Sequence, residues 1–193
     1  MLQRGRRGLG VSLFAFLLFL FPIACGETEF EFSKHRAYFN YDNSQHLDAT
    51  LMSAMNSMSP GIFCRIYISN GGRFAFLNNQ GKTSVQNMTE IERKSTCVLG
   101  VYNESGIIVG FGNLSSPHEF YAYDAQCPNC YEEASAPRYL LSMSSDGKAK
   151  CAHCGRTYDM NNRGVVASGA GGGKLMRYHA STTGPMGRLQ VNN

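Results

Sequence analysis

A repeated cysteine pair constrains this chain more than any other feature. Cys127 and Cys130 enclose two residues, and twenty residues further on Cys151 and Cys154 enclose two more. A C-x-x-C turn can aim two sulfurs at one point, so two such turns can surround one metal ion with four thiolates. The spacing therefore predicts a metal site formed by Cys127, Cys130, Cys151 and Cys154.

The identity of the metal follows from the ligand type. Four thiolates without histidine suit Zn²⁺ or a single iron, and they also suit an all-cysteine [2Fe–2S] cluster. Zinc is the favoured ion for an exported protein, because it has no redox chemistry of its own. Gly155 follows the second pair and would let backbone N–H groups approach the sulfurs. His153, inside that pair, is the one histidine with an alternative role as a ligand or electron-path residue.

Two other uses of these cysteines remain open from the residues alone. In an oxidising compartment the four could form two disulfides. A thioredoxin-type redox pair would need a βαβ unit, and the chain shows no such pattern. Cys64 and Cys97 stand alone in strand-like surroundings. They are either a disulfide or two separate buried thiols.

The first 24 residues predict an export signal. Three arginines, Arg4, Arg6 and Arg7, precede residues 11–24, which are apolar apart from Ser12 and one proline. This run is shorter than the ~20 residues that span a bilayer. A basic start and a short apolar core are typical of a secretory signal peptide. An uncleaved membrane anchor is the alternative.

The end of the apolar run suggests a lipid anchor. Ala24-Cys25-Gly26 resembles the lipobox of bacterial lipoproteins, which implies cleavage before Cys25 and acylation of Cys25. Residues 25–34 would then form a tether that holds the domain to the bacterial cell envelope, on the periplasmic side or at the outer-membrane surface. An ordinary signal peptide, leaving Cys25 free or in a disulfide, is the alternative.

Charge excludes one class of partner. The formal net charge is +4, and removing residues 1–24 takes away three arginines and no acids, which leaves about +1. The remaining chain has no dense run of lysine or arginine, so it lacks the electrostatic footprint of a nucleic-acid-binding protein.

The pattern of the remaining residues predicts a mainly β domain. One helix is expected over residues 47–58, where Leu47, Leu51, Met55 and Met58 follow helical spacing. Residues 97–102 and 107–111 are expected to form a hairpin, and residues 182–193 a flexible tail. The other expected strands are residues 37–41, 62–69, 73–77, 120–123, 139–143, 148–150, 157–159, 165–167 and 175–179. Such short, closely spaced strands favour a small antiparallel sandwich or barrel.

The order of motifs over residues 98–180 resembles the Rieske domain. A hairpin leads through residues 119–126 into the first cysteine pair, and the second pair is followed by Tyr158-Asp159, a turn at Gly164 and the small-residue loop 169–173. Leu175 and Tyr178 then match the closing L-x-x-Y. The chain is also similar to uncharacterised Rieske-like lipoproteins of Bacteroidetes. The resemblance implies a Rieske-like domain over residues 35–181 with its metal loops within residues 120–180.

The ligand pattern departs from that family. A Rieske site uses two cysteines and two histidines, but Asn129 and Cys154 occupy the two histidine positions here. The resemblance therefore implies the scaffold, and the four cysteines imply a zinc-ribbon or rubredoxin-like centre. The chain shows no nucleophile–base pair, carboxylate pair or open metal site, which argues against an enzyme. A structural zinc module that contacts another envelope protein is expected, with electron transfer to a redox partner as the alternative.

Overall fold

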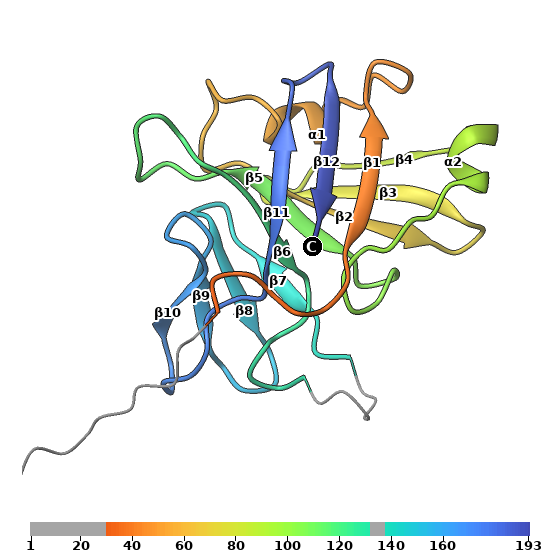
Figure 1. Cartoon of the computed structure of the whole chain (residues 1–193). Coiled ribbons are helices and arrows are strands. Elements are labelled where there is room, and N and C mark those ends of the chain that lie inside the picture. Colours follow the sequence, from red (N-terminus) through yellow and green to blue (C-terminus); the bar gives the residue numbers. More distant parts are fainter. Residues whose placement is uncertain (1–29, 132–137) are drawn as a thin grey trace, which may run out of the picture.

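Two antiparallel sheets carry the strands of this protein. The computed structural model describes residues 30–131 and 138–193 (Figure 1). The larger sheet has eight strands in the order β1-β12-β11-β6-β5-β2-β3-β4 and curls into a half-barrel, and the smaller has the order β10-β9-β8-β7. The predicted mainly β, antiparallel fold is confirmed. The strands of the larger sheet are β1 (Tyr38–Asp42), β2 (Phe63–Ser69), β3 (Arg73–Asn78), β4 (Thr83–Gln86), β5 (Ile107–Phe111), β6 (Phe120–Asp124), β11 (Arg177–Thr182) and β12 (Arg188–Asn192).

The predicted helix forms, but it is shorter than expected. Helix α1 spans Ala49–Ala54 and packs on the inner side of the larger sheet. The Asp48 side chain accepts a hydrogen bond from the backbone N–H of Leu51 at 3.0 Å, which caps the helix one residue after the expected start. Leu51 and Met55 are fully buried, whereas Leu47 and Met58 are exposed. The apolar pattern therefore identified the helix but overestimated its length.

The expected hairpin of residues 97–102 with β5 is wrong. In this segment only Val98 makes a strand-like bridge, and its partner is Tyr38 of β1, while β5 pairs with β2 and β6. Side chains take the backbone N–H groups that a strand would need. Asn103 accepts from Leu99 at 2.8 Å, and Asp124 accepts from Val101 at 2.7 Å. These bonds hold the segment in turns.

The carboxyl-terminal residues form a strand and not the flexible tail that the sequence predicted. Strand β12 lies between β1 and β11 and pairs with both (Figure 1). Leu189 and Val191 are buried while Arg188, Gln190 and Asn192 are exposed, which is the alternation of a half-buried strand. The alternation is present in the sequence, but it rests on only two apolar residues within a polar, glycine-containing stretch.

Two further elements were not predicted. Strand β4 forms one edge of the larger sheet, and helix α2 (Glu90–Lys94) follows it. The Thr89 hydroxyl accepts from the backbone N–H of Glu92, whose carboxylate accepts from the N–H of Thr89 in return. This capping box starts the helix, and its T-x-x-E signature is present in the sequence.

The smaller sheet packs against one face of the larger and shares a core with it. Its strands are β7 (Leu141–Met143), β8 (Lys148–Cys151), β9 (Thr157–Asp159) and β10 (Val165–Ser168). Phe63, Ile108 and Tyr123 from the larger sheet join Ala149 and Tyr158 from the smaller in this second core. Cys127 and Cys151 belong to the same core. The cysteine turns therefore lie where the two sheets meet.

The part of the chain that the structure describes holds no helix long and apolar enough to span a membrane. The expected signal peptide of residues 1–24 and the lipidation site Cys25 lie outside the described residues.

Candidate metal centre

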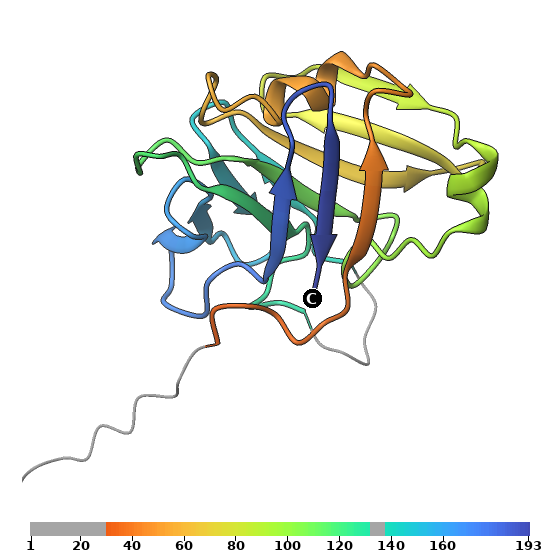
Figure 2. The ribbon, with the colours of Figure 1, turned by 45° about the horizontal axis from the view of Figure 1, so that its top comes forward.

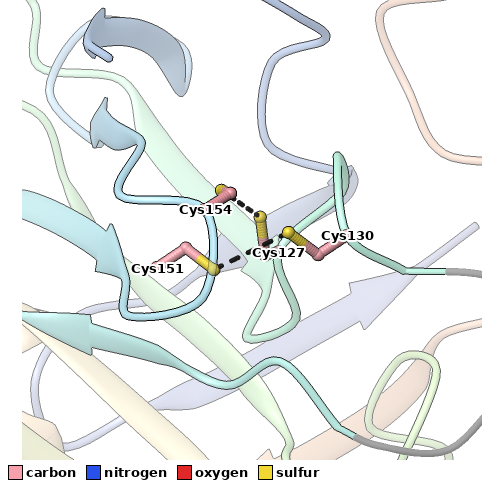
Figure 3. A group of neighbouring side chains, drawn as sticks. All are labelled: Cys127, Cys130, Cys151 and Cys154. Atoms are coloured by element: carbon pink, nitrogen blue, oxygen red, sulfur yellow. Dashed lines mark hydrogen bonds between the residues drawn. The ribbon is translucent and has the colours of Figure 1, made fainter. Parts of the chain in front are cut away.

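The structure brings the four predicted cysteines together. One ligand sulfur from each of Cys127, Cys130, Cys151 and Cys154 lies within 4.8 Å of all the others. The Sγ atoms of Cys127 and Cys154 are 3.8 Å apart, and those of Cys130 and Cys151 are 3.9 Å apart (Figure 3). Both short contacts join one turn to the other. All four are free thiols in the structure and form none of the disulfides that the sequence left open.

The two cysteine turns share one backbone hydrogen bond, from the fifth residue of the turn to the first. In the first turn (residues 127–131) the carbonyl of Cys127 accepts from the N–H of Tyr131 at 2.9 Å. In the second turn (residues 151–155) the carbonyl of Cys151 accepts from the N–H of Gly155 at 3.0 Å. Gly155 has a φ of +72°, a left-handed conformation that glycine adopts without strain.

The sheets hold each turn at its base. Cys127 follows β6 by three residues, and its N–H donates to the carbonyl of Tyr139 at 2.9 Å. Cys151 ends β8, and its N–H donates to the carbonyl of Arg156 at 2.9 Å. Cys127 and Cys151 are buried, whereas Cys130 and Cys154 are half-buried. The sulfur cluster thus has one side in the shared core and one side near the surface.

A hydrogen-bonded chain of side chains reaches the buried side of the cluster. The hydroxyl of Tyr158 lies 3.1 Å from the Sγ of Cys127. The side-chain amide of Asn129 donates to the same hydroxyl oxygen at 2.9 Å. Sequence analysis assigned no such role to Tyr158. The sequence feature that could have indicated this role is the position of Tyr158 on a short strand, four residues after Cys154, because alternate residues of such a strand face the core.

The glycine-rich loop 169–173 is bonded to both cysteine turns. Asn129 in the first turn donates to the carbonyl of Gly173 at 2.7 Å and accepts from its N–H at 2.9 Å. Arg156, which follows the second turn, donates to the carbonyls of Ala170 at 3.0 Å and of Gly171 at 2.9 Å. These bonds place the loop against both turns.

The cysteines differ in their electrostatic surroundings. Burial raises the pKa of Cys130, and its contacts with Cys154 and Cys127 raise it further. Burial also raises the pKa of Cys127, against the opposing effect of the Tyr158 hydroxyl. For Cys154, burial acts in the same direction, but hydrogen bonds from the backbone and side chain of Arg156 outweigh it and lower the pKa to about 6. Arg156 therefore stabilises thiolate charge at the exposed side of the cluster.

His153 lies at the surface beside the cluster. Its Nδ1 atom is 3.4 Å from the Sγ of Cys130, and its ring centroid is 4.5 Å from that of Tyr139. Among the described residues, the group that could hold a metal ion consists of the four cysteines without this histidine. His153 is placed to interact with a ligand sulfur from outside the set.

The two other cysteines in the described part of the chain lie away from the centre. Cys64 is buried in the core of the larger sheet, and Cys97 packs against that core. Both are free thiols, so the structure does not contain the disulfide that the sequence left open. Burial raises the pKa of Cys64 well above its usual range, and burial with the nearby Glu92 raises that of Cys97 to about 11. Neither thiol is activated as a nucleophile.

Comparison of the chain with protein-family models, with curated proteins and with solved structures finds no match. The Rieske resemblance therefore stays a prediction from the motifs.

Proposed function

We propose that this protein is an exported, lipid-anchored module of the bacterial cell envelope in which one zinc ion, held by four cysteines, shapes a surface for another envelope protein. The observation that carries the proposal is the meeting of Cys127, Cys130, Cys151 and Cys154, with all four sulfurs within 4.8 Å of one another. A basic, apolar leader that ends at Cys25 supports export and anchoring.

The spacing of the sulfurs supports a single ion. In a regular tetrahedron with Zn–S bonds of about 2.3 Å, neighbouring sulfurs are about 3.8 Å apart. The Cys127–Cys154 and Cys130–Cys151 distances are 3.8 and 3.9 Å, and none of the six sulfur–sulfur distances exceeds 4.8 Å. A [2Fe–2S] cluster binds its thiolates in two pairs on separate irons, which spreads the sulfurs more widely. The arrangement therefore favours one tetrahedral ion, zinc or a single iron.

A structural role for the ion follows from the small size of its sheet. Strands β7 to β10 have three or four residues each. Strands this short bury little apolar surface, and a structural zinc ion adds apparent binding energies of about 10 kcal/mol or more to folding. Four thiolates leave no open coordination position, so the centre offers no site for a substrate or water.

Electron transfer is the second candidate, and two observations favour it. The Tyr158 hydroxyl and the Arg156 side chain place hydrogen-bond donors against the sulfurs, and such bonds tune the reduction potential of an iron centre. Cys130, Cys154 and the exposed His153 bring the cluster close to the surface, where a redox partner could approach. In this version the four cysteines hold one iron or a [2Fe–2S] cluster.

Metal analysis of the purified chain separates the two candidates. The zinc proposal expects about one zinc per chain and no visible absorption. One iron, or two irons with acid-labile sulfide, together with visible absorption would make electron transfer the leading function. A metal-free protein whose four cysteines react with thiol reagents only after reduction would contradict both.

Labelling tests the anchor separately. Bacteria that express the full chain are grown with radioactive palmitate, and we expect label on the native chain and none on a Cys25→Ser variant. Label on both chains, or on neither, contradicts lipidation at Cys25.

A further inference from the structure

Strand β1 has an outer edge that is only partly paired. On its inner side it forms the ladder with β12. On its outer side Tyr38 exchanges two backbone hydrogen bonds with Val98, both of 2.8 Å. Backbone groups two residues apart in an antiparallel strand point to the same side, so the N–H and C=O of Asn40 also face outward. Among the described residues, no backbone group occupies that edge at Asn40.

A groove lies beside this edge, where the segment before Val98 diverges from β1. Residues 95–97 lead from α2 to Val98, and α2 stands beyond β1 in both ribbon views (Figures 1 and 2). Between α2, this segment and the edge of β1 lies a groove of about 710 Å³. Its volume is within the range of about 300–1,000 Å³ that is typical of ligand-binding sites. Cys97 lines this groove, whereas none of the four cysteines of the metal centre does.

The groove combines an apolar floor with an acidic border. Phe39 and Phe74 form the bottom of the groove, where each is only 2% exposed, and their ring centroids lie 5.5 Å apart. Ile91 of α2 lines the groove and is 79% exposed. The charged residues of the lining are three carboxylates and one guanidinium, Asp42, Glu90, Glu92 and Arg188.

Each of the three carboxylates lies near a basic side chain. The Arg188 guanidinium lies 3.5 Å from Asp42, and the His46 ring lies 3.0 Å from Glu92. Lys94 is 3.9 Å from Glu90, but both of these side chains are about 80% exposed, so water screens the pair strongly. The lining itself still holds two more carboxylates than guanidinium groups, and this excess of negative charge favours a basic ligand over an acidic one.

We propose that this groove binds an extended, basic segment of a partner protein as an added strand on β1. The free N–H and C=O of Asn40 would pair with the backbone of the segment, which is the β-augmentation mode of peptide recognition. Alternate side chains of the segment would then contact the apolar floor and the acidic border. This inference stands on β1 and α2, so it is independent of the metal and of the proposed function.

A peptide titration with the purified full chain tests the proposal. The probe is a fluorescein-labelled, end-capped heptapeptide of alternating lysine and valine, and binding is followed by fluorescence anisotropy. We expect saturable binding, and at least tenfold weaker binding of the matching glutamate–valine peptide. Two N-methylated versions of the lysine peptide, modified at the valines or at the lysines, block opposite backbone edges. One should bind much more weakly than the other, because a strand pairs through one edge.

Variants of β1 locate the bound strand. Asn40→Pro removes the outward N–H and leaves the β12 ladder intact, since proline is tolerated on an edge with its missing N–H directed outward. We expect about fivefold weaker binding than for Asn40→Ala, which keeps the N–H. Should Asn40→Pro alter the circular dichroism spectrum, Ile91→Ala replaces it. Leu114→Ala is its control, because Leu114 is also exposed, at 66%, and does not line the groove.

Three results would overturn the proposal. The first is no binding of the lysine–valine peptide at 1 mM, about the concentration of a very weak complex. The second is equal binding of the acidic peptide or of both N-methylated peptides. The third is binding that neither the Asn40→Pro nor the Ile91→Ala variant weakens relative to its control.

Discussion

The hydroxyl of Tyr158 lies 3.1 Å from the sulfur of Cys127, on the buried side of the four-cysteine cluster. The side-chain amide of Asn129 donates to the same hydroxyl oxygen, so the hydroxyl proton is free to point at the sulfur. A hydrogen bond from a neutral donor spreads thiolate charge, which stabilises a bound metal.

Tyr158→Phe should weaken metal retention. The ring continues to fill the shared core, but the bond to Cys127 is lost, and loss of such a partner typically lowers metal affinity 10- to 100-fold. Competition with a colorimetric zinc chelator measures the change. Tyr123→Phe is a matched control, because its hydroxyl is also buried but bonds to the carbonyl of Met160. An equal loss of metal affinity in both variants would contradict a specific role for the Tyr158 hydroxyl.

Single serine substitutions should separate the four cysteines from the other two. Cys151→Ser should reduce the bound metal well below one ion per chain, because a neutral hydroxyl is a much poorer ligand than a thiolate. Cys64→Ser should retain the full complement, since Cys64 lies in the other core. Elemental analysis of the two purified variants gives the answer. Full metal content in Cys151→Ser would exclude Cys151 as a ligand.

Metal removal should loosen the smaller sheet first. Its core includes Cys127 and Cys151, whereas the core of α1 and most of the larger sheet is a separate cluster. We expect hydrogen exchange to rise in β7, β8 and β9 after chelation and to stay slow in β2 and β3. Exchange mass spectrometry on the metal-loaded and chelated chain tests this. A uniform rise across both sheets would mean that the ion stabilises the whole domain as one unit.

Asn129→Ala should release the glycine-rich loop. The Asn129 side chain makes both a donor and an acceptor bond to Gly173, and alanine keeps neither. The N–H of Gly173 should then exchange faster, by about fivefold if the lost bond is worth the usual ~1 kcal/mol. Asn129→Asp is the comparison, because it retains the acceptor for that N–H. Equal protection in the native chain and in Asn129→Ala would show that Arg156 holds the loop by itself.

Arg177→Ala should destabilise the fold by about 2 kcal/mol. The side chain of Arg177 is 7% exposed, bonds to the carboxylates of Glu31 and Glu119, and stacks on the rings of Phe32 and Tyr121. Arg177→Lys should recover little of this loss, because an ammonium group cannot bridge two carboxylates in the same plane and stack on both rings. Urea unfolding of both variants gives the measurement. Full recovery by lysine would mean that charge alone matters.

Most strand positions and the ligand set could be read from the sequence. Runs of aromatic and aliphatic residues identified β2 and β3 nearly to their ends, because such side chains favour the pleated, partly buried surface of a sheet. The two C-x-x-C pairs predicted the sulfur cluster for a similarly local reason. A C-x-x-C turn is short enough to direct its two sulfur atoms to the same side, independently of the surrounding structure.

Only the tertiary structure decided the features that depend on partners distant in sequence. Residues 97–102 have strand-like side chains, but the side chains of Asn103 and Asp124 accept hydrogen bonds from backbone N–H groups of this segment. Strand β12 is stabilised by pairing with both β1 and β11, which are distant from each other in sequence. Two hydrogen bonds at the site join distant segments: Tyr158 and Cys127 are 31 residues apart, and Asn129 and Gly173 are 44 residues apart. A hydrogen bond between such segments exists only once packing has brought them together. The sequence therefore determined which atoms could hold the metal, and the fold decided which groups surround it.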